Sequence, residues 1–278
     1  MKEYAYRIVN VFAREGRLTG NPLCVFEDGT GLDDEAQQAL ARQFNLSETT
    51  FVFPSDKAIA RVRIYTPAYE MPFAGHPTLG TAHVVRDLKA PGDSLTLEMK
   101  AGIIPVSARG DRWTLQANAP TSRPAGESAA ELAQILGIGA SDIASPVLWV
   151  SVGREQLIVP VKSAEAVRRA QPRSEAFARL KSEHGAGQAL VFADSGSGVE
   201  ARFFFPSGPA VLEDPATGSA CANLGGWFIA TRPGEDIERT VSQGEQVGRP
   251  STLYLSVKSG VVRVGGQVIE LGRGRISL

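Results

Sequence analysis

The chain contains an internal repeat, and this feature limits its possible folds more than any other. Residues 63–85 read RIYTPAYEMPFAGHPTLGTAHVV, and residues 202–228 read RFFFPSGPAVLEDPATGSACANLGGWF. In each copy a strand ends at a proline, an acidic turn follows, and a Pro-x-x-Gly segment leads into a helix of small residues. Gly218 follows Gly75 by 143 positions, close to half of the 278 residues. The repeat therefore predicts two equivalent lobes, each of which is long enough to bury its own core.

Strands outnumber helices in the hydrophobic pattern. Alternation of apolar and polar residues predicts strands at 6–12, 61–65, 95–99, 113–117, 148–152, 190–192, 202–205 and 253–257. Helical spacing is clear in few places, which are 33–44 with Asp33 or Asp34 as its cap, 127–136, 164–170 and 174–183. Because strands and helices do not alternate one to one, a doubly wound Rossmann sheet is disfavoured.

A proline-rich stretch, residues 119–126, is typical of a hinge between lobes. It predicts an N-terminal lobe of residues 1–118 and a C-terminal lobe of residues 119–265. The last strand, about residues 266–278, is a candidate to complete the N-terminal lobe.

Charge and composition exclude several classes of protein. Lys and Arg number 29 against 30 Asp and Glu, a net charge of −1, which argues against a nucleic-acid binder. No apolar run approaches the length of a membrane span, and the first seven residues lack the apolar stretch of a signal peptide, so a cytoplasmic location is expected. The two cysteines, Cys24 and Cys221, have neither disulfide-scaffold nor zinc-site spacing, and we expect no metal.

The glycines at the two predicted helix starts have two interpretations. Small residues let surrounding strands approach closely, so each helix can simply fill the centre of its lobe. The first turn of a helix also carries free N–H groups and the positive end of the dipole, and glycine there lets a ligand approach the backbone. We therefore expect Gly75 and Gly218 to bind a small carboxylate-bearing substrate from both sides of a cleft.

Glu48 follows a predicted helix end at Asn45 and precedes an apolar strand. A solvated carboxylate at a strand start is the commoner role for such a residue. The alternative is partial burial among small hydroxyl residues, which would let the carboxyl group both accept and donate a proton.

Three further residues lie at the repeat helix starts. His76 and Asp214 come from opposite copies, and both are catalytic candidates. Asp214 can also cap its helix. Ser219 occupies the position that matches His76, and its hydroxyl can cap the helix, bind a substrate carboxylate, or do both.

At these residues the sequence resembles the PhzF-like family of phenazine biosynthesis proteins. The matching segments span nearly the whole chain: 20–25 (GNPLCV), 45–50 (NLSETT), 72–80 (PFAGHPTLG), 213–220 (EDPATGSA) and 243–251 (QGEQVGRPS). The resemblance implies an α+β, diaminopimelate epimerase-like fold, in which each lobe is a curled mixed sheet around a central helix. It also implies a homodimer and an isomerase that needs no cofactor, with Glu48 as the proton-transferring residue. In the phenazine branch the substrate is trans-2,3-dihydro-3-hydroxyanthranilate.

Two other functions stay open at this point. Racemases and epimerases of this fold that use no cofactor employ two cysteines, one at each helix start. Here those starts carry no cysteine, because Cys221 lies about one turn into its helix and Cys24 lies in an early strand. The other alternative is a non-catalytic small-molecule binding protein. Entry of solvent deuterium into a bound substrate would distinguish an isomerase from a binder.

Overall fold

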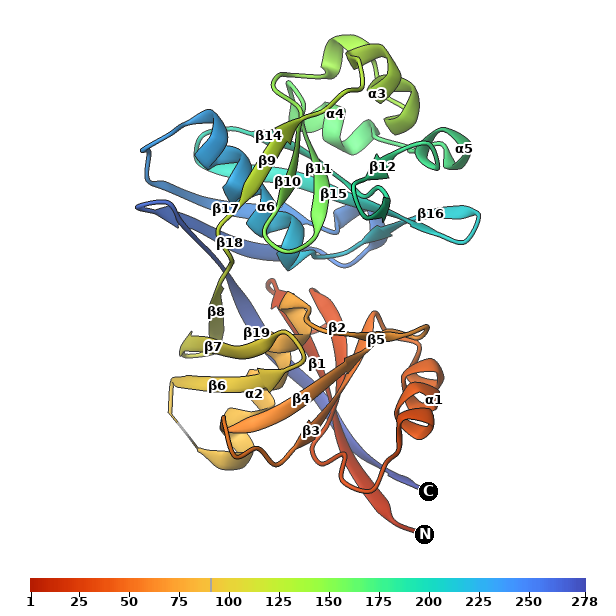
Figure 1. Cartoon of the computed structure of the whole chain (residues 1–278), viewed down its shortest axis with the longest axis vertical. Helices are drawn as coiled ribbons and strands as arrows, with labels where there is room; N and C mark the ends of the chain where they lie inside the picture. The colour runs from red at the N-terminus through yellow and green to blue at the C-terminus, as the bar shows by residue number, and fades with distance from the viewer. Residues whose placement is uncertain (91) are drawn as a thin grey trace. The chain divides into compact units, whose positions relative to one another are not determined.

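The computed structural model describes residues 1–90 and 92–278, and the chain divides into two compact units. Unit 1 combines Met1–Gln116 with Gly265–Leu278, and unit 2 is Ala117–Val264. The C-terminal segment therefore returns to the unit that contains the N-terminus. Figure 1 shows both chain ends in that unit.

Unit 1 is a curled sheet that closes around one helix. Its strands are β1 (Glu3–Ala13), β2 (Asn21–Phe26), β3 (Glu48–Phe53), β4 (Ala60–Tyr65), β5 (Glu70–Met71), β6 (Ser94–Met99), β7 (Gly102–Arg109), β8 (Arg112–Gln116) and the later part of β19 (Val261–Ser277). Pairing runs in the order β19, β1, β2, β3, β4, β6, β7 and β8, and β8 also pairs with β19. Helix α2 (Gly75–Lys89) contacts β1, β2, β3, β4, β6 and β8, so it lies at the centre (Figure 1).

The composition of α2 explains its central position. A Cβ atom on Gly80 would lie 2.6 Å from Leu23 Cδ2 and 2.8 Å from Val11 Cγ2, so only glycine allows β1 and β2 to pack this close. On another side of the helix, the buried hydroxyls of Thr81 and Thr50 share a hydrogen bond of 2.8 Å. Small residues thus serve packing here, as the first of the two interpretations expects.

Helix α1 (Asp34–Phe44) packs on β3 and β4. Asp33 is its N-cap and accepts a hydrogen bond from the N–H of Ala36 at 2.8 Å. Asn45 ends the helix in the left-handed conformation, with φ of 50°. The prediction of this helix and of both its ends is confirmed.

Unit 2 repeats the plan of unit 1. Its strands are β9 (Thr121–Pro124), β10 (Leu148–Ser151), β11 (Glu155–Pro160), β14 (Ala189–Asp194), β15 (Gly198–Ser207), β16 (Ala210–Asp214), β17 (Ile237–Gln243) and β18 (Ser251–Lys258), with a separate hairpin of β12 (Lys181–Ser182) and β13 (Gly185–Ala186). The central helix α6 (Gly218–Thr231) contacts β9, β10, β11, β17 and β18. Helices α3 (Ala129–Leu136), α4 (Ala164–Arg169) and α5 (Ser174–Phe177) lie away from α6 in Figure 1.

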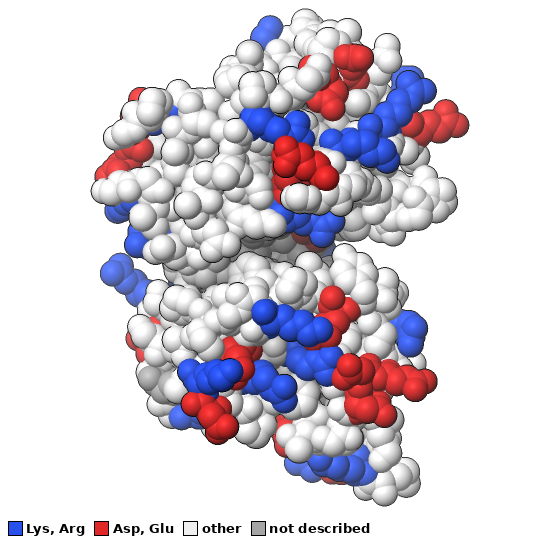
Figure 2. Space-filling model, in the orientation of Figure 1, with Lys and Arg blue, Asp and Glu red and all other residues white. Residues whose placement is uncertain are grey.

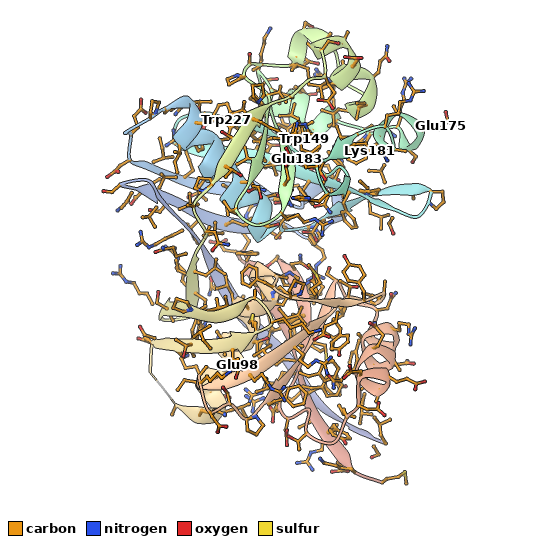
Figure 3. The ribbon with its side chains drawn as sticks, in the orientation of Figure 1. Glu98, Trp149, Glu175, Lys181, Glu183 and Trp227 are labelled. Atoms are coloured by element: carbon orange, nitrogen blue, oxygen red, sulfur yellow. The ribbon has the colours of Figure 1, made fainter. Side chains whose placement is uncertain are left out.

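The core of unit 2 contains two tryptophans whose side chains are labelled in Figure 3. Trp149 comes from β10, and Trp227 comes from α6. Trp227 donates its indole N–H to the carbonyl of Pro146 at 2.9 Å, which satisfies the one polar atom of a buried ring.

The two units share strand pairings as well as element order. In unit 1, β2 pairs with β3 in parallel, β3 with β4 antiparallel, and β4 with β6 in parallel. In unit 2, β11, β14, β15 and β17 pair in the same order and with the same directions. The repeat in the sequence is therefore a repeat of topology.

One ion pair occurs at the same place in both copies. Arg63 on β4 binds Glu70 on β5 with a shortest N–O distance of 2.7 Å, and Arg202 on β15 binds Glu213 on β16 at 2.6 Å. Both arginines also lie over an aromatic ring two positions later, at 5.3 Å from the Tyr65 ring and 4.8 Å from that of Phe204. Each pair fixes the hairpin that precedes a central helix.

Two expectations from the sequence were wrong. Helix α5 ends at Phe177, and residues up to 183 turn into the β12–β13 hairpin, because Phe177 and Leu180 both turn into the core of unit 2. The stretch 119–126 is not only a linker, since Thr121–Pro124 forms β9 and pairs with β10. Proline is tolerated there because β9 pairs with another strand on one side.

Surface charge is interleaved. On the face shown in Figure 2, Lys and Arg side chains alternate with Asp and Glu, and no patch of one sign dominates. That pattern agrees with the net charge of −1 and offers no basic track for a polyanion on this face. None of the helices in the described residues is long and apolar enough to cross a membrane.

Candidate active site

In unit 1 the structure brings Glu48 and His76 into contact. Glu48 is the first residue of β3, and His76 is the second residue of α2. His76 Nε2 lies 3.3 Å from Glu48 Oε2, and the two side chains are 7% and 14% exposed. The pair is thus an acid and a base in direct contact and largely removed from solvent.

The protonation of His76 follows from its surroundings. Burial lowers the pKa of His76 to about 3, and a hydrogen bond with the backbone of Pro22 opposes this shift. Since Nε2 is the atom that faces Glu48, the bond to Pro22 comes from Nδ1–H. Nε2 of the neutral ring then carries a lone pair that faces the carboxyl group of Glu48.

The segment around Pro22 is fixed by tight packing. A Cβ atom on Gly20 would lie 2.5 Å from the Val11 carbonyl oxygen, and Gly20 has φ of +78°, so glycine is required. Ser47, beside Glu48, donates its hydroxyl to Asn21 Oδ1 at 3.1 Å. The matching segments 20–25 and 45–50 therefore form one local structure that holds both Glu48 and the acceptor of His76.

In unit 2 the start of α6 is braced by a glutamine. Thr217 is the N-cap residue of α6, and its hydroxyl donates to Asp214 Oδ2. The buried amide of Gln243 accepts from the N–H of Thr217 at 3.3 Å and donates to the Asp214 carbonyl at 2.8 Å and to Thr217 Oγ1 at 3.1 Å. The N-cap position that we considered for Asp214 belongs to Thr217.

Packing allows only glycine at position 244, directly after Gln243. Gly244 has φ of +85°, and a Cβ atom there would lie 2.3 Å from the Arg249 carbonyl oxygen and 2.5 Å from that of Pro215. The segment 243–251 thus packs directly beneath the turn that carries Asp214.

Ser219 belongs to a different network. Its hydroxyl oxygen accepts a hydrogen bond from Gln156 Nε2 at 3.1 Å, and the same nitrogen donates to Gln188 Oε1 at 3.2 Å. Gln156 in turn accepts from Asn223 Nδ2 at 2.8 Å. None of these amides was singled out from the sequence, because glutamine and asparagine without a motif carry no signal of their own.

Each unit therefore gathers part of the predicted set. Unit 1 brings together Glu48, Gly75 and His76, and unit 2 brings together Asp214, Gly218 and Ser219. Helices α2 and α6 begin at Gly75 and Gly218, which confirms the predicted helix starts.

Both cysteines are buried. Cys24 belongs to the aromatic core of unit 1, and Cys221 lies inside α6. Burial raises the pKa of each thiol well above its ordinary value, which disfavours the thiolate form that proton transfer at neutral pH requires.

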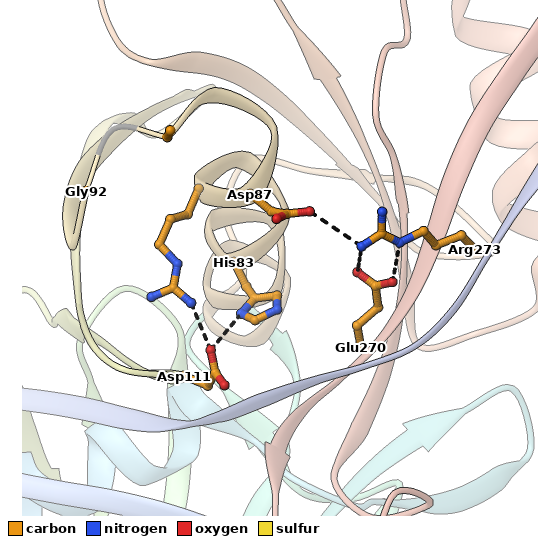
Figure 4. Close-up of a pocket in the computed structure, with 8 residues that line it drawn as sticks. His83, Asp87, Gly92, Asp111, Glu270 and Arg273 are labelled. Carbon is orange, nitrogen blue, oxygen red and sulfur yellow. Dashed lines mark hydrogen bonds and ion pairs between the residues drawn. The ribbon is translucent and has the colours of Figure 1, made fainter.

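Two cavities of the described residues are not lined by the candidate residues. The larger, about 530 Å³, lies at the far end of α2 (Figure 4). Its charged groups neutralise one another, since Arg86 binds Asp111 at 2.8 Å and Arg273 binds Glu270 at 2.5 Å. The smaller, about 360 Å³, is lined mostly by apolar residues between 124 and 148.

Within residues 1–90 and 92–278, no group of three or more His, Cys, Asp or Glu side chains is arranged to hold a metal ion.

Comparison with known proteins relates this geometry to a family. The family model described as phenazine biosynthesis-like protein (PhzC-PhzF) matches residues 9–273. A protein of Pasteurella multocida named an uncharacterized isomerase is 38% identical over 98% of this chain and 94% of its own. The trans-2,3-dihydro-3-hydroxyanthranilate isomerase of Pseudomonas aeruginosa is 34% identical over 99% of this chain and all of its own.

Solved structures agree in fold. A PhzF-family phenazine biosynthesis protein of Bacillus anthracis superposes with a TM-score of 0.88 at 26% identity, and each chain is covered completely. A hydroxyproline epimerase of Agrobacterium vitis, 12% identical, has a TM-score of 0.64 over 99% of this chain and 91% of its own, which shows the fold alone. The predicted diaminopimelate epimerase-like fold is confirmed. The chain belongs to the phenazine biosynthesis-like (PhzC-PhzF) family, and it is an isomerase.

Proposed function

We propose that this isomerase moves a proton between carbon atoms of a small carboxylated substrate, needs no cofactor, and uses Glu48 as its acid and base. The observation that supports this proposal best is the contact between Glu48 Oε2 and His76 Nε2, 3.3 Å apart and largely buried. A carboxyl group beside a neutral imidazole can accept a proton as a carboxylate and donate one as a carboxylic acid, and the reaction needs both forms.

The proposed mechanism has two half-steps. As a carboxylate, Glu48 removes a proton from a substrate carbon while His76 stays neutral, and the electron pair delocalises toward the substrate's double bonds and carboxylate. The resulting carboxyl group, whose proton can exchange with solvent, then delivers a proton to a different carbon. Free N–H groups at the start of α2, which begins at Gly75, stabilise the negative charge that develops between the two transfers.

The finer parts of the proposal are the substrate and the assembly. In unit 2 we propose a catalytic role for Asp214 and substrate-binding roles for Gly218 and Ser219. The named activity of the Pseudomonas aeruginosa relative makes trans-2,3-dihydro-3-hydroxyanthranilate the first compound to assay. The family resemblance further implies a homodimer, which light scattering would measure.

The racemase alternative requires groups that the chain does not place at its helix starts. A two-base mechanism needs an acid or base at each helix start, and both thiols are buried elsewhere. The binding-protein alternative conflicts with the family's named isomerases and leaves the Glu48–His76 pair without a role.

Substitution of Glu48 with glutamine tests the proposal. Glutamine keeps the size of the side chain but cannot accept and return a proton. We expect at least a 10⁴-fold loss of turnover, at the upper end of the ~10²–10⁴ range for acid–base catalysis, because both half-steps fail. Substrate affinity should stay within about tenfold of the wild type, since other groups bind the carboxylate.

Incorporation of solvent deuterium into the substrate, followed by mass spectrometry, is the measurement. Glu35→Gln makes the same chemical change at an exposed position on α1 and should leave exchange intact. A Glu48→Gln protein that retains a tenth of its exchange rate would assign the proton transfer to another residue, with Asp214 the first to examine.

A further inference from the structure

The shared topology identifies the residue in unit 2 that corresponds to Glu48. Tyr65 pairs with Glu70 across the β4–β5 hairpin, and Phe204 pairs with Glu213 across the β15–β16 hairpin. On their other sides, Tyr65 pairs with Thr49 and Phe204 pairs with Ala189. Glu48 and Gln188 each precede these partners by one residue, so they occupy equivalent positions.

A packing contact supports this equivalence independently. The same registers align Leu23 with Gln156, and the helix starts align Gly80 with Asn223. In unit 1, Leu23 packs against Gly80. In unit 2, Gln156 and Asn223 make a hydrogen bond of 2.8 Å in the same place. An apolar contact in one copy is thus an amide contact in the other.

The orientation of this amide network is determined by its hydrogen bonds. Asn223 Oδ1 accepts from the N–H of Val152 at 2.9 Å, and its Nδ2 donates to the carbonyl of Arg154 at 2.9 Å. Asn223 Nδ2 therefore also faces Gln156 Oε1, and Gln156 Nε2 faces outward. Buried amides of this kind are costly unless they are satisfied, and here the network satisfies them.

The outward-facing Nε2 of Gln156 then determines which atoms of Gln188 and Ser219 act as acceptors. It donates to Gln188 Oε1 at 3.2 Å and to Ser219 Oγ at 3.1 Å. Each of these oxygens thereby accepts one hydrogen bond and faces Gln156, and Gln188 and Ser219 also carry donors, an amide N–H and a hydroxyl. In the described part of the chain, no protein group accepts from Gln188 Nε2. Gln188 and Ser219 are both partly exposed.

We propose that Gln188 is a substrate-binding residue that, with Ser219, donates hydrogen bonds to the substrate carboxylate. This inference deepens the proposed function and rests on it. Two neutral donors at the start of α6 suit an anion, because the helix N-terminus adds free N–H groups and a favourable dipole. A carboxylate at position 188 would repel the same anion.

The proposal gives the two copies different tasks. The copy in unit 1 carries the titratable pair Glu48 and His76, and the copy in unit 2 carries Gln188 and Ser219 at the equivalent positions. The second copy therefore offers hydrogen-bond donors at the positions where the first copy offers an acid–base pair.

Binding of two stable probes tests the proposal without turnover. Anthranilate carries an amino group beside a carboxylate on a six-membered ring, and anthranilamide replaces the carboxylate with a neutral amide. Isothermal titration should show that the wild type prefers anthranilate by at least tenfold. Gln188→Glu preserves the side chain's size and the acceptor for Gln156, and it should reduce that preference to threefold or less.

A second variant and a control keep the result interpretable. Gln188→Met removes the donor without adding charge, and it should weaken anthranilate binding about tenfold while anthranilamide binding changes less. Gln134→Glu adds the same charge at an exposed position on α3 and should keep the wild-type preference. Unfolding curves verify that each variant is folded.

A folded Gln188→Glu protein that retains the full preference for anthranilate would overturn the proposal. So would a wild type that binds neither probe or does not distinguish them. Failure of the proposed function has a different signature, since it would show as deuterium exchange that survives Glu48→Gln while the probe preference still depends on Gln188.

Discussion

At the scale of single residues, burial decides what each group can do. His76 is held neutral because the ring is buried at the start of α2, although the bond of its Nδ1–H to Pro22 opposes this shift. The same burial makes protonation of the ring unfavourable in the folded state. Burial of this neutral ring therefore makes the folded protein less stable at acid pH.

This cost predicts a pH dependence. Burial lowers the pKa of His76 to about 3 in the folded protein from its ordinary value of 6.5, so its contribution to stability is complete above pH 6.5 and is lost as pH falls toward 3. Between pH 7.5 and pH 5 the free energy of unfolding should fall by about 2 kcal/mol from this group alone. Urea unfolding of the wild type and His76→Gln at both pH values measures it, and the variant should lose less.

His184→Gln is the matched control, because His184 is exposed, and it should behave as the wild type does. His83, whose pKa is also lowered by burial, supplies part of the slope that remains in His76→Gln. Equal losses in the wild type and His76→Gln would mean that His76 is not buried as a neutral ring.

Sequence motifs identified Glu48, His76 and Asp214, because catalytic candidates with glycines and prolines around them form recognisable strings. Gln188 could not be found in that way. Its equivalence to Glu48 depends on strand register, and the loops between the repeated strands differ in length, so no fixed spacing connects the two residues.

At the scale of elements, each central helix depends on the strand that follows it. In unit 2, Gln243 and Gly244 at the end of β17 hold the turn from Asp214 to Thr217. In unit 1 the N–H of Ala101 donates to the carbonyl of Pro72 at 3.2 Å, at the corresponding end of β6. In both units, the residues at the end of the strand after the central helix thus pack against the Pro-x-x-Gly segment and fix the start of that helix.

Gly244→Ala should therefore destabilise the protein strongly. Its Cβ atom would meet two carbonyl oxygens at 2.3 and 2.5 Å, in addition to the strain of a positive φ. We expect a loss of about 2–4 kcal/mol in urea unfolding. Gly248→Ala isolates the strain, since Gly248 also has a positive φ but no atom within 4 Å of its Cβ position, and it should cost about 1 kcal/mol. Equal losses for both variants would show that packing under the Asp214 turn is loose.

At the scale of the whole chain, the repeat was sufficient to predict two similar lobes with central helices at Gly75 and Gly218. It could not predict the ends of elements such as α5, where the burial of Phe177 and Leu180 prevails over helical spacing. Nor could it show that residues 119–126 include a paired strand, because its prolines fit an edge strand as well as a linker. Local patterns specify elements, whereas tertiary burial decides where they stop.

The path of the chain predicts how the units respond to truncation. Residues 267–277 of β19 pair with β1 along most of its length, from Glu3 with Ser277 to Ala13 with Gln267, so they complete the sheet of unit 1. Unit 2 is continuous in sequence from Ala117 to Val264 and keeps all of its residues when the chain is cut after Gly266. The truncated chain should lose the structure of unit 1 and retain that of unit 2.

Hydrogen–deuterium exchange resolved by peptide would measure this outcome. In the truncated chain, β1 to β4 should exchange at least a hundredfold faster than in the wild type, because removal of the β19 segment takes away the strand that pairs with β1 along most of its length. Peptides from β14, β15 and α6 should stay protected. Gln267→Ala alters an exposed side chain in the same strand without removing its backbone bonds, and it should leave both units protected. Protection of β1 to β4 that survives the truncation would mean that unit 1 does not need the returning strand, whereas loss of protection in α6 as well would mean that the two units unfold as one.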